Sequence, residues 1–279
     1  MVKYNKKKII ASVFLGLVIA ILYLPIIWLI VFSFTNTTSI SNWSGFSLDA
    51  YKELFAGTSS GEIFSALCNT LFIALIASAI STILGTLAAI GINSLRNKRV
   101  KAAYSAVNQI PMVNSEIVSA IGLMLLFGLF KTIFPMQGNV EMVAVIFAHV
   151  AFCTPYVVLN VLPRIRQTDN KIYEAALDLG CTPWQALRKV VIPDIMPGIV
   201  MGFMMSVTLS VDDFVITNFT IDGFYTLSTL IYSKASGKKP LPIEMRALSA
   251  IIFIVILLVM LGITKANQKS ADKDKAVKK

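Results

Sequence analysis

Long apolar runs alternate with short polar segments along the whole chain. Most of the runs have about 20 residues or more, which is enough for a helix to cross a bilayer core of roughly 30 Å. The third begins in a polar stretch, 109–116, that contains Pro111. The pattern predicts one all-α membrane domain, residues 1–279, with six transmembrane helices. Their expected spans are about 9–34, 64–92, 117–130, 142–162, 196–218 and 245–264.

The polar segments between the runs predict smaller elements. A short helix is expected over 47–55, and a second, partly re-entrant helix over 227–233. Residues 163–195 form the longest polar stretch that contains residues typical of helix starts and helix ends. We call this stretch the loop module. The Lys-rich segment 265–279 is predicted to be a disordered tail, because it is polar and carries almost no apolar side chains.

Composition excludes a soluble domain. Hydrophobic residues make up 56% of the 279 residues and charged residues 14%, with a mean hydropathy of +0.74. The net charge of +10 would suggest a nucleic-acid partner in a soluble protein. Here, if both termini are cytoplasmic, 19 of the 25 basic residues fall on cytoplasmic segments. This positive-inside bias predicts a cytoplasmic loop module and no nucleic-acid partner.

The residue types of catalytic and metal sites are scarce. Cys68, Cys153 and Cys181 have no metal-ligand spacing and are expected to be small buried residues. His149 stands alone in an apolar run, where a hydrogen-bonded interior histidine is favoured over a ligand. The chain has no G-x-x-x-x-G-K-[ST] phosphate loop. We therefore expect no metal site, no catalytic residues and no ATP hydrolysis on this chain.

The first half of the loop module has the pattern of an amphipathic helix. Thr168 and Asp169 are candidate caps for its start. Gly180 follows where a helix exit needs a residue that tolerates positive φ. The polar face carries Lys171, Glu174 and Asp178, and the apolar face carries Ile172, Ala175, Ala176 and Leu179.

The second half of the loop module predicts another helix. Thr182 is the expected N-cap, Pro183 fits the first helical position, and Gln185 can close a capping box. We expect Pro193 to end this helix. Its apolar stripe is formed by Trp184, Leu187 and Val191.

This loop module resembles the EAA loop of ABC-importer permeases. The resemblance rests on Glu174-Ala175-Ala176, on Gly180, and on Ile192-Pro193. It implies a binding-protein-dependent permease of the MetI-like fold whose loop docks on a cytoplasmic ATPase. An ordinary cytoplasmic helical hairpin is the alternative. The residues expected to couple to the ATPase are Glu174, Ala175, Ala176, Asp178, Gly180, Pro183, Arg188 and Pro193.

Acidic residues lie within or beside the apolar runs. Asp212 and Asp213 fall inside the fifth run, and Glu116 begins the third. A charged side chain at membrane depth costs about 2.5–3.5 kcal/mol on insertion scales, so it normally faces a partner or a water-filled path. No Lys or Arg lies in the interior of a predicted span, since Arg246 stands at the edge of the sixth, and this favours a cationic cargo. Hydrogen bonding between helices, or a position nearer the outer water, is the alternative.

Three aromatic residues on the outer segments are further candidates for the substrate pathway. Trp43, Phe219 and Tyr225 could make cation–π contacts with such a cargo. An aromatic belt at the membrane interface explains them equally well.

A wider resemblance makes the predicted identity of the cargo more specific. The run from Thr208 to Phe219, the continuation DGFYTL at 222–227, Glu244, and NSEIV at 114–118 are similar to spermidine/putrescine importer permeases of the PotC type. The resemblance implies a multi-pass subunit of a bacterial cell membrane. It also implies a second, similar permease, two ATPase subunits that bind ATP and Mg²⁺, and an extracellular polyamine-binding protein.

Other functions remain open on the sequence. The same machine could carry ferric iron, thiamine or a sugar. A stand-alone secondary transporter would be expected to show inverted repeats, and none stands out.

Overall fold

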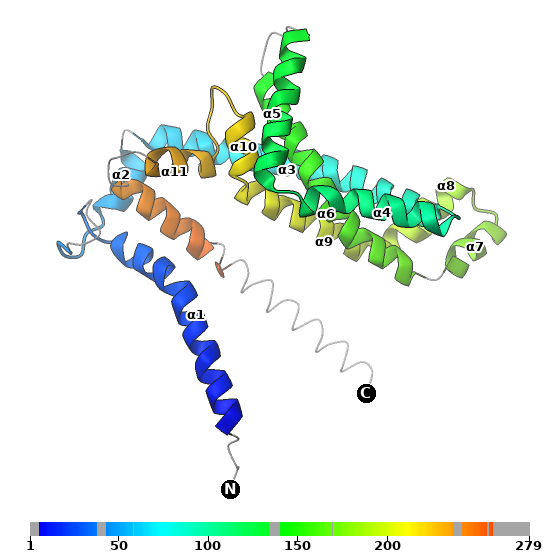
Figure 1. Cartoon of the computed structure of the whole chain (residues 1–279), viewed down its shortest axis with the longest axis horizontal. Helices are drawn as coiled ribbons and strands as arrows, with labels where there is room; N and C mark the ends of the chain where they lie inside the picture. The colour runs from blue at the N-terminus through cyan, green and yellow to red at the C-terminus, as the bar shows by residue number, and fades with distance from the viewer. Residues whose placement is uncertain are drawn as a thin grey trace. The chain divides into compact units, whose positions relative to one another are not determined.

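The computed structural model describes residues 6–37, 43–57, 59–133, 140–168, 170–236, 242–255 and 257–258, and the regular elements among them are helices (Figure 1). The chain divides into two compact units. Unit 1 comprises Met1–Ile63 with Ile231–Lys279, and unit 2 comprises Phe64–Leu230.

Unit 1 contains helix α1 (Lys6–Phe32), helix α2 (Asp49–Ala56) and a helix over 243–255. The Ser33 hydroxyl and the Tyr51 hydroxyl lie 2.8 Å apart, which ties the end of α1 to α2. Ser47 accepts a hydrogen bond from the backbone N–H of Asp49 at 3.0 Å and so begins α2. The short helix predicted over 47–55 is confirmed.

Unit 2 is built from α3, which begins in unit 1, and the helices that follow it as far as α11, which begins in unit 2 and ends in unit 1. Helix α11 confirms the helix predicted over 227–233. The bounds are α3 Ser60–Ser94, α4 Lys98–Val113, α5 Glu116–Ile133, α6 Val140–Gln167, α7 Asn170–Asp178, α8 Pro183–Ala186, the π-helical turn η1 Leu187–Val191, α9 Ile192–Asp212, α10 Val215–Thr220 and α11 Leu227–Ala235.

Small residues let α3, α6 and α9 approach closely at the core of unit 2. A Cβ added to Gly85 would lie 2.7 Å from the Val157 side chain, and one added to Gly202 would lie 3.1 Å from it. The hydroxyls of Ser81 and Ser206 are 2.8 Å apart and join α3 to α9. Close backbone approach at small residues is typical of helices that pack in a membrane, where burial from water does not drive association.

Five of the described helical stretches are long and apolar enough to span a membrane. They coincide with the first five predicted spans, except that the fifth begins earlier, at Pro183, and ends earlier, at Asp212. The predicted sixth span, 245–264, begins in the helix over 243–255, but 259–264 and the tail 265–279 lie outside the described residues. The five stretches are Ser12–Phe32, Ser60–Ser94, Glu116–Ile133, Glu141–Gln167 and Pro183–Asp212.

The expected end of a helix at Pro193 is wrong. The chain continues from Pro183 to Asp212 as one helical stretch, with the π-helical turn η1 just before Pro193. In this turn the N–H of Ile192 reaches back to the carbonyl of Leu187. The wider turn accommodates the proline, which has no N–H to donate. The second arm of the loop module is therefore continuous with the fifth apolar helix.

Two other boundaries also differ from the sequence prediction. The fifth helix does not reach residue 218, because α9 ends at Asp212 and α10 follows as a separate short helix. A helix that the sequence analysis did not predict, α4 from Lys98 to Val113, precedes the third span, and residues 114–115 separate it from α5.

Candidate functional site: loop module and outer cavity

The loop module contains a glycine turn of the Schellman type. Gly180 has φ +85°, which the sequence predicted for the exit of the first helix. Its N–H bonds to the Leu177 carbonyl at 2.9 Å, and the Cys181 N–H bonds to the Ala176 carbonyl at 3.1 Å. These two bonds satisfy carbonyls that the last turn of α7 would otherwise leave open. The predicted order of helix, glycine turn and helix is confirmed.

The second helix of the module begins with a complete capping box. The Gln185 N–H donates to the Thr182 hydroxyl at 3.3 Å, and the Thr182 N–H donates to the Gln185 side-chain oxygen at 3.1 Å. Pro183 occupies the first turn, where a missing N–H costs nothing. The geometry fixes the angle between α7 and α8 through local bonds.

A side-chain hydrogen bond joins the two helices that flank the loop module. The Thr168 hydroxyl donates to the Asp194 carboxylate at 2.5 Å and so ties the end of α6 to the start of α9. The expected cap of α7 stays a prediction, because Asp169 lies outside the described residues.

Most of the predicted coupling residues lie on the surface of this chain. Leu179 is 87% exposed and Trp184 is 64% exposed. The apolar face predicted for the first helix is therefore not packed inward, apart from Ala176. A surface that combines large apolar side chains with carboxylates is typical of a docking site. Exposed coupling residues are Glu174, Ala175, Asp178, Gly180, Pro183, Arg188 and Pro193.

Asp213 ends α9 and caps α10. Its backbone leaves the helix with ψ 125°, and its carboxylate accepts the N–H groups of Ile216 at 3.3 Å and Thr217 at 2.8 Å. It also accepts the Thr217 hydroxyl at 2.7 Å. The predicted fifth span, 196–218, placed Asp212 and Asp213 within one helix, and this is wrong because α9 ends between them.

His149 completes this buried junction. Its Nδ1 lies 2.7 Å from the Ser210 hydroxyl, and its Nε2 lies 2.9 Å from the Thr217 hydroxyl and 3.5 Å from the Asp213 carboxylate. The prediction of a hydrogen-bonded interior histidine is confirmed. The alternative of hydrogen bonding between helices thus describes Asp213, which links α6, α9 and α10.

The other candidates for the substrate pathway are dispersed. Asp212 is exposed at the end of α9, and Glu116 is exposed in the first turn of α5. Tyr225 is exposed, and its carbonyl accepts the Asn69 side chain at 3.1 Å. Trp43 belongs to unit 1, where its ring meets Phe32 edge to face at 5.7 Å.

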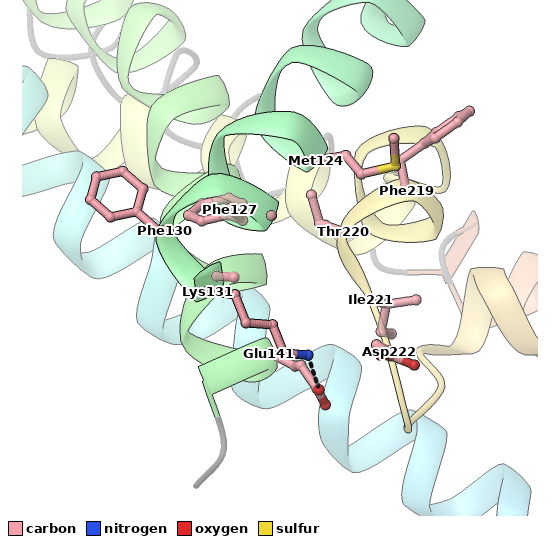
Figure 2. Close-up of a pocket in the computed structure, with 11 residues that line it drawn as sticks. Met124, Phe127, Phe130, Lys131, Glu141, Phe219, Thr220, Ile221 and Asp222 are labelled. Atoms are coloured by element: carbon pink, nitrogen blue, oxygen red, sulfur yellow. Dashed lines mark hydrogen bonds and ion pairs between the residues drawn. The ribbon is translucent and has the colours of Figure 1, made fainter. Parts of the chain in front are cut away.

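Phe219 does line a cavity, with residues that the sequence prediction left out. The cavity has a volume of about 370 Å³ and lies between α5, α6 and α10 with the segment that follows it. Figure 2 shows Lys131 and Glu141 joined on one side, at 3.3 Å, and Asp222 on the other. We call it the outer cavity. Its lining is Met124, Phe127, Gly128, Phe130, Lys131, Glu141, Ala144, Phe219, Thr220, Ile221 and Asp222.

The outer cavity combines aromatic surface with carboxylates. Within the described part of the chain, no ion pair engages Asp222, whereas Glu141 is held by Lys131. Such a lining suits an elongated cation with apolar segments between its charges. Glu141 was not predicted, and Asp222 was quoted only as part of the motif at 222–227, because nothing in these short polar segments indicates that they share a cavity.

Comparison with known proteins identifies the family. A family model described as binding-protein-dependent transport system inner membrane component matches residues 81–273. This chain belongs to that family. The resemblance of the loop module to ABC-importer permeases is thereby confirmed, and so is the all-helical permease fold.

Two curated relatives and one solved structure illustrate the similarity. The putrescine transport system permease protein PotI of Escherichia coli K12 is 33% identical over 83% of this chain and 81% of its own. The spermidine/putrescine transport system permease protein PotC of Haemophilus influenzae is 34% identical over 92% of this chain and 96% of its own. A crystal structure of a bacterial ABC transporter involved in alginate import matches with a TM-score of 0.66 at 16% identity, covering 93% of this chain and 96% of that one, and supports the fold.

Proposed function

We propose that this chain is a permease subunit of an ATP-driven polyamine importer and forms half of its membrane pathway. The cargo is inferred from the similarity of this chain to permeases named for putrescine and spermidine transport. This similarity extends over four-fifths or more of both chains. In this proposal the chain crosses a bacterial cell membrane several times and has both termini in the cytoplasm.

In the proposed importer, several chains supply ATP binding, cargo delivery and the membrane pathway. This chain carries no phosphate-loop motif, so ATP and Mg²⁺ are bound by two separate ATPase subunits. A second permease completes the pathway, and an extracellular binding protein delivers the cargo. The exposed carboxylates and apolar side chains of the loop module are the surface that meets the ATPase. Their exposure within this chain supports that role.

The continuous helix from Pro183 to Asp212 is the proposed path of coupling. A movement of the loop module displaces this helix as a unit, because the helix continues through the π-helical turn and Pro193 without a break. At its far end, Asp213 and His149 tie it to α10, which lines the outer cavity. Figure 1 shows α7 and α8 at one end of the α6–α9 pair and α10 at the other. A displacement in the cytoplasm is thus delivered to the outer cavity.

The outer cavity is the proposed first binding site for the cargo in this chain. An ammonium group pairs with the Asp222 carboxylate, and the methylene segments lie against Phe127 and Phe219. A cation over an aromatic ring contributes about 0.5–1 kcal/mol at an exposed site. Polyamines fit this lining because they alternate charged nitrogens with short apolar segments.

Uptake of labelled spermidine by cells with and without the gene tests the proposal. We expect deletion to abolish the uptake that this importer supplies, and unlabelled putrescine to compete with it. Ferric iron, thiamine and sugars should not compete. Competition by one of these instead would assign the importer to that other cargo and overturn the polyamine proposal.

A further inference from the structure

An apolar groove lies between the end of α3 and helix α4. It has a volume of about 470 Å³ and is separate from the loop module and the outer cavity in its lining. Ile92 is buried at its base, and Tyr104 and Val107 on α4 are exposed. Its lining consists of Ala88, Gly91, Ile92, Leu95, Tyr104, Val107 and Asn108.

Four cationic side chains lie within six residues at the junction of the two helices, Arg96 in the turn and the other three at the start of α4. Lys101 donates from Nζ to the carbonyl and the side-chain oxygen of Asn93, at 3.0 and 2.8 Å. Arg96, Lys98 and Arg99 are exposed, and within the described part of the chain no ion pair engages them. The groove lining includes Leu95, directly beside the turn, so cationic and apolar surfaces are contiguous.

We propose that this groove binds one anionic phospholipid. Its phosphate accepts hydrogen bonds from Arg96, Lys98 and Arg99, and an acyl chain lies along the groove between α3 and α4. Guanidinium groups bind phosphate oxygens in a bidentate manner, and clusters of basic residues beside membrane helices attract anionic lipids.

Charge complementarity selects this occupant over others. The positive-inside bias accounts for the side of the membrane on which the cations lie, but it does not require an apolar groove beside them. A neutral lipid or an apolar helix of another subunit would fill the groove without using the cations. A free anion such as inorganic phosphate would use the cations without filling the groove.

The test uses the assembled importer with its partner subunits. Binding of phosphatidylglycerol and of phosphatidylcholine is compared by native mass spectrometry at equal lipid concentrations. We expect phosphatidylglycerol to bind at least ten-fold more tightly. Each of Arg96→Gln, Lys98→Gln and Arg99→Gln should weaken it about five-fold. Arg166→Gln, which removes an exposed cation at the end of α6, is the matched control and should leave binding unchanged.

A glycine substitution tests the groove separately from the charges. Gly91 lines the groove and a Cβ there would meet no atom within 4 Å, so Gly91→Leu is the substitution chosen to occupy the groove. We expect it to weaken phosphatidylglycerol binding about ten-fold. Gly122→Leu on α5, also in open space, is the control for a leucine on a helix surface.

Three results would overturn the proposal. Equal binding of the two lipids would remove the role of the cations. Full binding by Gly91→Leu would remove the role of the groove. Displacement of phosphatidylglycerol by millimolar inorganic phosphate, without any effect of Gly91→Leu, would identify a free-anion site instead.

Discussion

At the scale of single residues, Asp213 and Asp212 have different environments although they are neighbours. Asp213 is buried and accepts three hydrogen bonds at the start of α10, whereas Asp212 is exposed. The carboxylate of Asp213 satisfies N–H groups that have no other partner in the first turn of a helix. The buried acid therefore holds the junction of α9 and α10 together, and Asp212 remains available to solvent or cargo.

Replacement of Asp213 by alanine should destabilise the protein. The change leaves the Thr217 N–H and hydroxyl without their acceptor in a buried site, which costs about 1–3 kcal/mol. We expect a lower midpoint of thermal unfolding for the purified importer. Asp212→Ala is the matched control and should leave the midpoint within error. Equal midpoints for the two variants would show that the cap of α10 does not contribute to stability.

Replacement of Asp222 by asparagine should slow transport without loss of assembly. The outer cavity would keep its shape but lose the carboxylate that no described ion pair engages. We expect spermidine uptake at saturating binding protein to fall about five- to ten-fold, as for the loss of roughly 1 kcal/mol. Glu53→Gln, an exposed acid on α2, is the control. Normal uptake by Asp222→Asn would remove the outer cavity from the pathway.

At the scale of helices, the loop module is fixed by local bonds and the core of unit 2 by close contacts. The turn at Gly180 depends on a positive φ that most residues adopt only with strain. The packing of α3 and α6 depends on the absence of a side chain at Gly85, where a Cβ would lie 2.7 Å from Val157. These two glycines are required for different reasons. A substitution at Gly180 should impair uptake, and a substitution at Gly85 should lower the stability of unit 2.

Gly180→Pro should abolish uptake while insertion into the membrane stays normal. Proline fixes φ near −65°, whereas Gly180 has φ +85°, and proline also removes the N–H that bonds to Leu177. The orientation of α7 against α8 would change, but the apolar helices would not. Uptake and membrane level are measured together. Gly45→Pro, at a left-handed glycine of an outer segment, is the control and should transport. Unchanged uptake by Gly180→Pro would contradict the coupling role.

Gly85→Ala should destabilise unit 2, and Val157→Ala should compensate. The added methyl group overlaps the Val157 side chain, and overpacking of this kind costs about 1–3 kcal/mol. Thermal unfolding of the two single variants and the double variant gives the coupling between the sites. Gly122→Ala, in open space, should be neutral or slightly stabilising. Additive effects at Gly85 and Val157 would contradict the contact.

Features that depend on neighbouring residues could be predicted from the sequence. The capping box of Thr182 and Gln185 and the exit at Gly180 follow from side chains within a few positions of each other. The apolar runs predicted where the long helices lie, because the length needed to cross a bilayer is a simple physical constraint.

Features that depend on distant contacts could not be predicted. The apolar run continues through residues 214–219, so nothing in it signals that Asp213 turns back to cap α10. The passage through Pro193 needs a π-helical turn, which has no clear sequence pattern. The outer cavity brings Glu141 and Asp222 together from segments about 80 positions apart.

At the scale of the whole molecule, one continuous helical stretch leads from the loop module, the proposed docking surface, towards the outer cavity. The family and the relatives support a permease subunit of a binding-protein-dependent transport system, and the proposed function adds a separate ATPase as its energy source. The helix from Pro183 to Asp212 provides the connection within this chain. Transport and ATP hydrolysis should therefore depend on each other, and both should depend on a polyamine.

Uptake by vesicles that contain the assembled importer tests this central claim most directly. Vesicles with ATP on the ATPase side and with the loaded binding protein outside should accumulate labelled spermidine. They should accumulate none without ATP, and none when this chain is omitted. Excess unlabelled putrescine should compete, whereas thiamine and ferric iron should not. Spermidine accumulation without ATP, or its absence from the complete system while thiamine or iron accumulates, would contradict the account.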